Sequence, residues 1–296
     1  MSLRCRNANM SCYEEWVQTL ARSLVRLWKT IGAARPRVAR FRAALLLRFG
    51  MSLASALIWA NAAVGAQTPL PGATYTDVGS RAESVAIGDL NGDQVPDLAV
   101  ANFDDGDVSV LLGIGDGTYA APVQYPVGNE PRSVAIGDLN GDQALDLAVA
   151  YNDHFAILLG AGDGTFAVST YFPTDSGAHA IAIGDLDGDP VPDLVVANRE
   201  GDSVSVMLGP GGENFAGPVN FAAGNGPTSV AIGDLNGDQI ADLAMALSEG
   251  IAVSVALGVG DGAFGAPVQH VAGVSPEHVA IGDLDGDQVP DLVLSY

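Results

Sequence analysis

Beyond residue 66, apolar and polar residues alternate in short runs, and no segment has helical spacing. The clearest alternation recurs three times, as Val108, Val110 and Leu112, as Val204, Val206 and Leu208, and as Val253, Val255 and Leu257. A period of two in β-branched residues, bounded by Gly and Asp clusters, is typical of β-strands. The pattern therefore predicts an all-β fold for this part of the chain.

The strands belong to a repeated unit of four short segments. In the first unit the segments are residues 84–88, 97–102, 107–112 and 122–127. Four short strands in a unit of about 40–50 residues are the spacing of a β-propeller blade. We therefore expect four-stranded antiparallel blades, with about five repeats visible in this chain.

Glycine and aspartate mark the turn between the third and fourth strands of each unit. The turns span residues 113–119, 160–166 and 258–264, with a diverged copy at 209–215. Asp-Gly supplies the positive φ that such turns need. We expect Asp116, Asp163 and Asp261 to shape these turns rather than to bind metal.

The loop between the first and second strands carries oxygen-bearing side chains at alternate positions. In residues 89–97, Asp89, Asn91, Asp93 and Asp97 occupy positions 1, 3, 5 and 9, and position 7 offers the carbonyl of Val95. Calcium takes six to eight oxygen ligands, and loops of this kind supply them at these spacings. Carboxylates around an empty centre repel by roughly 4 kcal/mol per pair at 4 Å and a dielectric of about 20. The alternative is that these residues are plain turn formers.

The same loop recurs four more times, starting at Asp138, Asp185, Asp234 and Asp283. The spacings between successive loops are 49, 47, 49 and 49 residues. Self-similarity at a fixed period of 20–50 residues is typical of a solenoid, a propeller or an array. The chain is therefore expected to bind up to five calcium ions.

Charge divides the chain into two parts. Ten of the thirteen Lys and Arg residues lie in residues 1–50. From Gln67 onward there are three arginines and thirty-three acids, so the formal charge is 3 − 33 = −30. Such a surface repels nucleic acids, phosphates and anionic membranes. Five divalent ions would offset ten of these charges.

The first 66 residues have the features of an export leader. Residues 1–50 are basic and partly helical in pattern, which indicates a functional helix, a long basic flank or a start codon misassigned upstream of Met51. Residues 51–66 are the hydrophobic region of a signal peptide, ending in small residues. The alternative is an uncleaved membrane anchor, and either reading places the repeats at 67–296 in a secreted or cell-surface location.

Residues with catalytic potential are few in the repeat region. Both cysteines, Cys5 and Cys12, lie in the leader, and no lysine and no Gly-x-Ser-x-Gly sequence follows residue 66. The four histidines do not occupy equivalent positions in the repeats, and we interpret them as ordinary surface or turn residues: His154, His179, His270 and His278. The sequence predicts that this segment is not an enzyme.

The loops, the Gly-Asp-Gly-Thr-Phe turns and the run Phe264-Gly265-Ala266-Pro267 resemble the FG-GAP repeats of bacterial VCBS-type proteins and integrin α-chains. The resemblance covers roughly residues 74–296. It implies a β-propeller in which the loops join the first two strands of each blade. It also implies calcium on one face of the disc and ligands on the opposite face.

The resemblance assigns metal ligands position by position in all five loops. The first site is Asp89, Asn91, Asp93, the Val95 carbonyl and Asp97; the second is Asp138, Asn140, Asp142, the Ala144 carbonyl and Asp146. The third is Asp185, Asp187, Asp189, the Val191 carbonyl and Asp193; the fourth is Asp234, Asn236, Asp238, the Ile240 carbonyl and Asp242. The fifth is Asp283, Asp285, Asp287, the Val289 carbonyl and Asp291.

Position 6 departs from the family pattern, which commonly has Gly there. Four loops carry Gln at this position and the third carries Pro190. Because a non-Gly residue in the left-handed region costs roughly 1–2 kcal/mol, we expect the loops to turn mainly at the Gly of position 4. Proline cannot adopt that conformation, so we expect the third site to be geometrically distinct.

Two blade counts are compatible with the sequence. Residues 74–78 resemble a fourth strand, and pairing them with the strand ending at Tyr296 would close a five-bladed ring. Family propellers usually have seven blades, which favours truncation of a larger propeller.

Three functions are compatible with these features. The leading one is a secreted, calcium-stabilised propeller that binds an extracellular protein or glycan as an adhesion module. The second is the noncatalytic propeller of a larger extracellular enzyme active on polysaccharides. The third is a lectin, which the absence of tryptophan after residue 66 disfavours.

Overall fold

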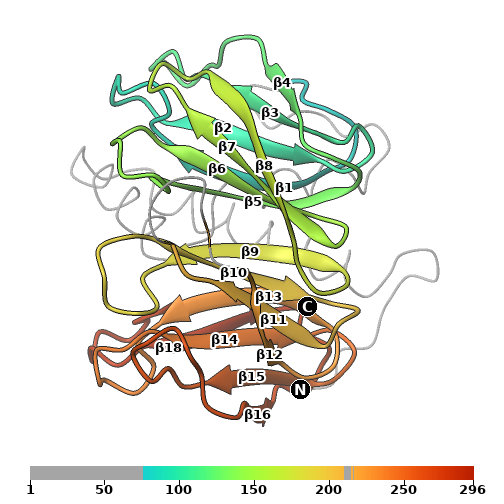
Figure 1. The fold of residues 1–296 in the computed structure, drawn as a ribbon, viewed down its shortest axis with the longest axis vertical. Helices are drawn as coiled ribbons and strands as arrows, with labels where there is room; N and C mark the ends of the chain where they lie inside the picture. Colours follow the sequence, from blue (N-terminus) through green and yellow to red (C-terminus); the bar gives the residue numbers. More distant parts are fainter. Residues whose placement is uncertain (1–75, 210–214, 216) are drawn as a thin grey trace, which may run out of the picture. The chain divides into compact units, whose positions relative to one another are not determined.

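The computed structural model describes residues 76–209, 215 and 217–296, and these form an all-β fold (Figure 1). They contain eighteen strands in four four-stranded antiparallel sheets and one two-stranded sheet. The expected leader, residues 1–50, and the expected signal region, residues 51–66, lie outside the described residues. Among the residues described, none belongs to a helix long and apolar enough to span a bilayer.

Each four-stranded sheet is a blade whose strands follow one another in sequence order. Blade 1 comprises β1 (Ala82–Gly88), β2 (Asp97–Asn102), β3 (Asp107–Leu111) and β4 (Val123–Pro126). Blade 2 comprises β5 (Pro131–Gly137), β6 (Asp146–Tyr151), β7 (His154–Gly160) and β8 (Phe166–Pro173). Blade 3 comprises β9 (Ala178–Gly184), β10 (Asp193–Asn198), β11 (Ser203–Met207) and β12 (Val219–Ala222). Blade 4 comprises β13 (Pro227–Gly233), β14 (Asp242–Leu247), β15 (Ala252–Ala256) and β16 (Val268–Val271), and the fifth sheet pairs β17 (His278–Gly282) with β18 (Asp291–Ser295).

The four segments expected in the first unit coincide with β1 to β4 to within a few residues. The alternation predicts them correctly because the apolar residues of each middle strand must face two neighbouring blades. The predicted fold of four-stranded propeller blades is confirmed.

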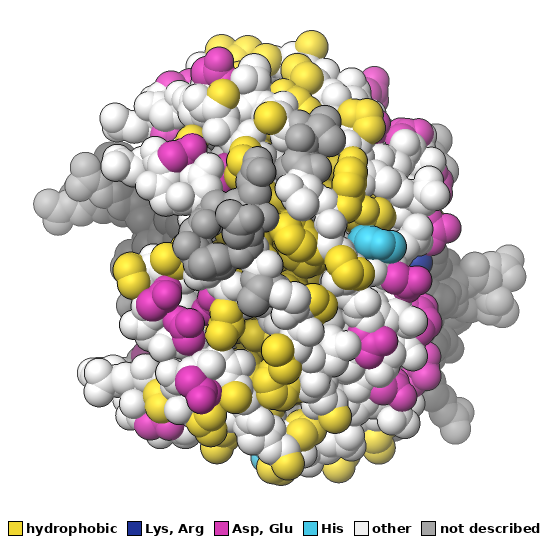
Figure 2. All heavy atoms as spheres, viewed as in Figure 1, with side chains coloured by type: hydrophobic (Ala, Val, Ile, Leu, Met, Phe, Trp, Pro, Cys, Tyr) yellow, Lys and Arg dark blue, Asp and Glu magenta, His cyan; other side chains and the backbone are white. Residues whose placement is uncertain are grey.

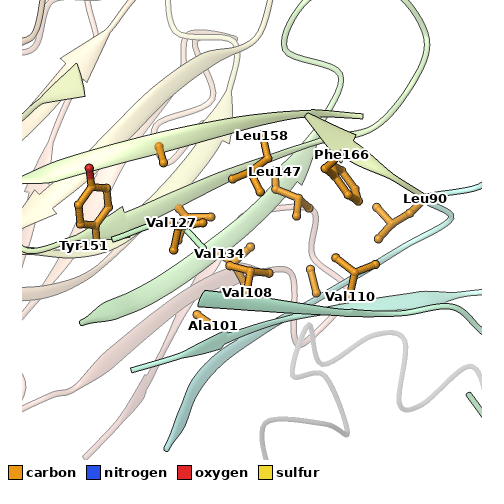
Figure 3. Close-up of a cluster of buried hydrophobic side chains, with 13 residues drawn as sticks. Leu90, Ala101, Val108, Val110, Val127, Val134, Leu147, Tyr151, Leu158 and Phe166 are labelled. Carbon is orange, nitrogen blue, oxygen red and sulfur yellow. The ribbon is translucent and has the colours of Figure 1, made fainter. Parts of the chain in front are cut away.

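Adjacent blades bury apolar side chains between them. In β6, Leu147 and Val149 pack in the core shared with blade 1, while Ala148 and Ala150 pack in the core shared with blade 3. Successive side chains of a strand point to opposite faces, so one strand contributes to two cores. Figure 3 shows the core between blades 1 and 2, where Leu147 and Leu158 lie near Val110 and Phe166.

The first strands of successive blades contact one another in the order β1, β5, β9, β13 and β17. A glycine ends each of these strands, and in β1, β5, β9 and β13 an isoleucine of the next blade packs over it. A Cβ on Gly88 would lie 3.2 Å from Ile136, and a Cβ on Gly137 would lie 3.2 Å from Ile183. Glycine therefore suits these positions, because a larger residue would press against the isoleucine of the next blade.

Serine hydroxyls add hydrogen bonds between the same strands. The N–H of Val134 donates to Oγ of Ser84 at 3.2 Å, and the N–H of Val279 donates to Oγ of Ser229 at 3.2 Å. These bonds link strands about 50 residues apart in sequence. They fix the register in which one blade docks on the next.

The segment before β1 corrects one expectation. Residues 76–78 belong to no strand, so the expected strand at 74–78 is wrong for the part that the structure describes. The N–H of Gly79 donates to Oδ1 of Asn102 at 3.1 Å, and the N–H of Ser80 donates to the carboxylate of Asp105. Because side chains of blade 1 take these N–H groups, the segment runs along that blade and forms no ladder with it.

Candidate functional site

The five predicted metal loops lie between the first and second strands of their sheets, at residues 89–97, 138–146, 185–193, 234–242 and 283–291. In each loop, position 1 follows the glycine that ends the first strand, and position 9 begins the second strand. Antiparallel hairpins therefore place all five loops at the same end of their sheets, called here the loop end. The opposite end holds the turns between second and third strands.

The aspartate at position 1 accepts hydrogen bonds from the backbone of its own loop. Oδ2 of Asp89 accepts from the N–H of Gln94 at 2.8 Å, and Oδ1 accepts from the N–H of Asp93 at 3.0 Å. The equivalent bonds to the position-6 N–H join Gln143 to Asp138, Gln239 to Asp234 and Gln288 to Asp283. In the fourth loop, backbone N–H groups lower the pKa of the Asp234 carboxyl below its usual value, and the N–H of Gln239 has the largest effect.

Position 6 contradicts the expectation that the loops avoid the left-handed region there. Gln94 has φ 67°, and the glutamines of the second, fourth and fifth loops have similar values. The position-4 glycine is also left-handed, with φ 76° at Gly92. The strain at position 6 is offset because this conformation aims the N–H at the carboxylate of position 1, and hydrogen bonds to charged groups contribute roughly 1.5–3 kcal/mol.

The third loop differs, as expected from Pro190. Proline has no N–H, so Asp185 cannot receive the position-6 hydrogen bond seen in the other loops. Its Oδ1 accepts from the N–H of Gly188 at 2.7 Å, a bond that the second, fourth and fifth loops also make. The third loop therefore leaves one carboxylate oxygen without the bond that its counterparts receive.

Positions 3 and 5 form successive Asx turns. In the first loop, Oδ1 of Asn91 accepts from the N–H of Asp93, and Oδ1 of Asp93 accepts from the N–H of Val95 at 2.7 Å. The same pattern repeats in every loop, so the residues at position 7, including Val95 and Ala144, donate their N–H to position 5. Their carbonyls as metal ligands remain a prediction.

Asn or Asp at position 3 divides the loops into two classes. The amide of Asn91 donates to Oδ2 of Asp93 at 3.0 Å, and Asn140 and Asn236 do the same in the second and fourth loops. The third and fifth loops have Asp187 and Asp285, which have no amide to donate. Carboxylates at positions 3 and 5 then repel each other, and a bound cation would offset this repulsion in these two loops.

Carboxylates converge in these same two loops. Asp185, Asp187 and Asp193 place oxygens within 4.8 Å of one another, and Asp283, Asp285 and Asp287 do so in the fifth loop. The donors are hard, negatively charged oxygens, which suit calcium and magnesium rather than softer metals. The residues present therefore fit a calcium ion.

The aspartate at position 9 has a structural role that the sequence analysis missed. Asp97 is fully buried; its Oδ2 accepts from the N–H of Leu90 at 2.8 Å and its Oδ1 from the N–H of Gly113 at 2.7 Å. The equivalent residues of the next three loops are also fully buried and make both bonds: Asp146, Asp193 and Asp242. Asp291 makes the bond to the loop at 2.9 Å and is half-buried.

Position 9 therefore joins the loop to the turn that follows the third strand. All other predicted carboxylate and amide ligands are at least partly exposed, so position 9 alone is withdrawn from water in the first four loops. Burial raises the pKa of Asp193, and Asp187 and Asp189 add to the rise, while the N–H groups of Gly209 and Leu186 oppose it. The glycine recurs in every one of these turns, but no local sequence pattern connects it to the aspartate of position 9.

The Asp-Gly turns behave as expected. Oδ1 of Asp116 accepts from the N–H of Thr118 at 2.9 Å and from its hydroxyl, and Asp163 pairs with Thr165 in the same way. The threonine hydroxyl is the main cause that lowers the pKa of each carboxyl. In the diverged copy, residues 210–214 lie outside the described residues.

One histidine departs from the expectation of ordinary surface residues. His154, His270 and His278 are exposed, whereas His179 is half-buried in β9. Its Nδ1 lies 2.9 Å from the carbonyl of Thr228 in blade 4, so Nδ1 carries the proton. Burial is the main cause that lowers the pKa of His179.

The end opposite the loops holds a second cluster that the sequence analysis missed. The guanidinium carbons of Arg81 and Arg132 lie 3.9 and 4.6 Å from the ring centroid of Phe103. A surface hollow of about 370 Å³ adjoins the ring, lined by Phe103, Asp104, Asp105, Gly106, Asn129, Glu130 and Asn152. Two of the three arginines beyond residue 66 meet here, and that scarcity was the available signal.

Comparisons with solved structures identify the fold. A structure of BBS1N in complex with ARL6DN, soaked with lead, matches with a TM-score of 0.52 and 17% identity over 69% of this chain and 61% of that one. An Agrocybe aegerita lectin that recognises non-reducing terminal N-acetylglucosamine matches with a TM-score of 0.49 and 22% identity over 72% of this chain and 60% of that one. The chain thus spans about three fifths of the length of these structures. No curated protein matches the chain in sequence.

The repeat itself is matched by a family model. The FG-GAP-like repeat matches three times, at residues 89–149, 138–196 and 185–245. Each match begins at position 1 of a metal loop and runs past the metal loop of the next blade. The chain therefore belongs to the FG-GAP-like repeat family.

Proposed function

We propose that this chain is a calcium-stabilised, extracellular binding module. The observation that supports it most is the convergence of three carboxylates within 4.8 Å in each of the third and fifth loops. Bound calcium would supply positive charge that offsets carboxylate repulsion. The residues at positions 1, 3, 5 and 9 would hold the ion, together with the position-7 carbonyl.

The proposal assigns two classes of calcium site. The third and fifth loops, with Asp at position 3, have higher affinity because four carboxylates face one ion. The first, second and fourth loops have lower affinity because Asn at position 3 neutralises part of the site internally. Site affinity generally rises with the number of charged ligands.

Calcium titration calorimetry on the full chain tests this assignment. We expect two tight sites followed by up to three weaker ones. Asp187→Asn and Asp285→Asn should each convert one tight site to a weak one, and Asp116→Asn, in an exposed turn, should change neither class. Five equal sites would refute the two classes, and no heat of binding would refute calcium binding itself.

The binding surface that we propose lies at the end opposite the loops. The repeated loops vary little from blade to blade, whereas the turns between second and third strands differ in length and composition: 103–106, 152–153, 199–202 and 248–251. Arg81, Arg132 and Phe103 lie at this end. In the view of Figure 2, acidic side chains are spread over the described surface, whereas Lys and Arg show in one small area.

Because loops on a rigid scaffold present side chains to partners, this varied end suits recognition of an extracellular protein or glycan. A glycan array and a panel of extracellular matrix proteins, probed with the full chain, test this role. Binding that Arg132→Ala abolishes and Asp116→Asn preserves would support the varied end. Binding that is insensitive to Arg132 and to the other residues of that end would refute it.

We propose export for the chain on the basis of its leader and its acidic repeats. Cell fractionation and N-terminal sequencing of the mature protein test this. A mature chain beginning near Gln67 in the extracellular fraction is the expected result. Recovery of the intact leader in a cytoplasmic fraction would contradict it.

A further inference from the structure

Two metal loops are held by two blades at once. In the first loop, the N–H of Leu90 donates to Asp97 of its own blade, and the carbonyl of Leu90 accepts from the N–H of Gly164 in blade 2 at 3.1 Å. In the third loop, the carbonyl of Leu186 accepts from the N–H of Gly262 in blade 4, also at 3.1 Å. The residue at position 2 of these loops therefore forms backbone hydrogen bonds with two neighbouring blades.

Side-chain burial at position 2 reinforces this link. Leu90 is 2% exposed and Leu186 is 3% exposed, and each packs in the core between its own blade and the next. The leucine thus fixes the loop to the interface through its side chain as well as through its peptide groups. Neither peptide group of position 2 can move without disturbing one blade or the other.

The partner glycines fit closely against the preceding blade. Gly164 has φ 82° and Gly262 has φ 75°, both in the left-handed region. A Cβ on Gly164 would lie 2.7 Å from Leu112 of blade 1, and a Cβ on Gly262 would lie 2.5 Å from Leu208 of blade 3. Glycine is required at both places, and the Asp-Gly turn of one blade is docked on the metal loop of the blade before it.

Position 2 lies between two predicted metal ligands. Asp89 precedes Leu90 and Asn91 follows it, and in the third loop Asp185 and Asp187 flank Leu186. When both flanking side chains are held by one ion, the peptide between them has little freedom left. The carbonyl that accepts from the next blade is part of that peptide.

We propose that filling the first and third loops strengthens the docking of blade 2 on blade 1 and of blade 4 on blade 3, through the Leu90–Gly164 and Leu186–Gly262 hydrogen bonds. This coupling rests on the proposed calcium binding. By linkage, docking of the next blade raises the metal affinity of the loop by the same factor. The proposal is limited to these two blade pairs. The diverged turn of blade 3 has Glu213 at the position that Gly164 and Gly262 occupy in the turns of blades 2 and 4.

Amide hydrogen exchange of the full chain, resolved by residue, tests the coupling. Calcium should slow exchange at the N–H of Gly164 and of Gly262 at least tenfold relative to excess chelator. The N–H of Val134, which bonds to Ser84 at the far end of the interface, reports general tightening. It should change less than either glycine.

Two variants, one in each loop, serve as controls for each other. Asp89→Asn should abolish the calcium effect at Gly164 and preserve it at Gly262, whereas Asp185→Asn should do the reverse. Calcium binding by calorimetry without slower exchange at either glycine would overturn the coupling and leave the proposed function standing. Equal changes at both glycines in each variant would also overturn it, and absence of calcium binding would overturn both proposals.

Discussion

Asp97 and Gly113 are sixteen residues apart, and a hydrogen bond of 2.7 Å joins the carboxylate of the first to the N–H of the second. The other oxygen of Asp97 accepts from Leu90 in the metal loop. One buried carboxylate therefore connects the metal loop to the end of the third strand. The same arrangement recurs in blades 2, 3 and 4, so it belongs to the design of the blade rather than to one site.

Asp97→Asn should destabilise the fold even without metal. The amide would place an NH₂ against one of the two N–H donors, leaving a buried donor unpaired at a cost of about 1–3 kcal/mol. Urea unfolding of the full chain in chelator measures this loss. Asp116→Asn, in an exposed turn, should cost much less, and equal losses for the two variants would contradict the buried-clamp role.

Asn91→Asp should give the first loop the carboxylate set of the third. The variant loses the hydrogen bond from the Asn91 amide to Asp93 and gains repulsion, so in chelator it should lose about 1–2 kcal/mol. A domain of this size would then melt roughly 2–8 °C lower. Added calcium should shift the variant more than the parent chain. Gln124→Glu adds the same charge on the exposed strand β4, and a similar calcium response there would argue against a site-specific effect.

Position 6 should accept glycine and reject proline. Gln94→Gly relieves strain of about 1–2 kcal/mol but adds chain entropy worth about 0.5–1 kcal/mol, so the net change should be a small gain. Gln94→Pro cannot adopt φ 67° and removes the N–H that bonds to Asp89, at a cost of about 2–4 kcal/mol. Equilibrium unfolding in chelator compares the two variants. If Gln94→Pro were as stable as the parent chain, the left-handed geometry of this loop would be wrong.

His179 should make stability depend on pH. Burial, followed by Arg132 and Arg199, lowers the pKa of His179 below 6.5. A base whose pKa is lower when folded contributes stability that is fully present above pH 6.5 and is lost as pH falls through the folded pKa. His179→Gln should flatten the fall in urea midpoint below pH 6.5, while His270→Gln, at an exposed site, should leave it unchanged. An identical pH profile for both variants would rule out this role.

Much of the fold could be predicted from the sequence because the alternation that predicts each strand recurs in the repeats. The alternation of Val108 and Val110, bounded by Asp107 and Gly113, is enough to place β3. The repeat spacing then transfers that assignment to every blade. Residues 76–78 could not be predicted in this way, because the side chains of Asn102, at the end of β2, and of Asp105, in the turn after it, hold the segment that follows them.

The details of the site could be predicted from the sequence less well than the fold. Propensity argues against Gln94 at positive φ, and only the position of the Asp89 carboxylate shows why that conformation is favourable. The burial of Asp97 depends on Gly113, a partner sixteen residues away that no local pattern connects to the loop. Contacts between blades, such as Gly164 with Leu90, depend on the docking of whole sheets and have no signal in the sequence of either loop.

The central question is whether calcium holds the blades together. Thermal unfolding of the full chain, in calcium, in magnesium and in excess chelator, answers this in one experiment. We predict that calcium raises the melting temperature by many degrees over chelator, that magnesium raises it much less, and that Asp187→Asn with Asp285→Asn removes most of the calcium effect. An equal melting temperature in all three conditions would mean that the aspartates only shape turns, and it would contradict the account.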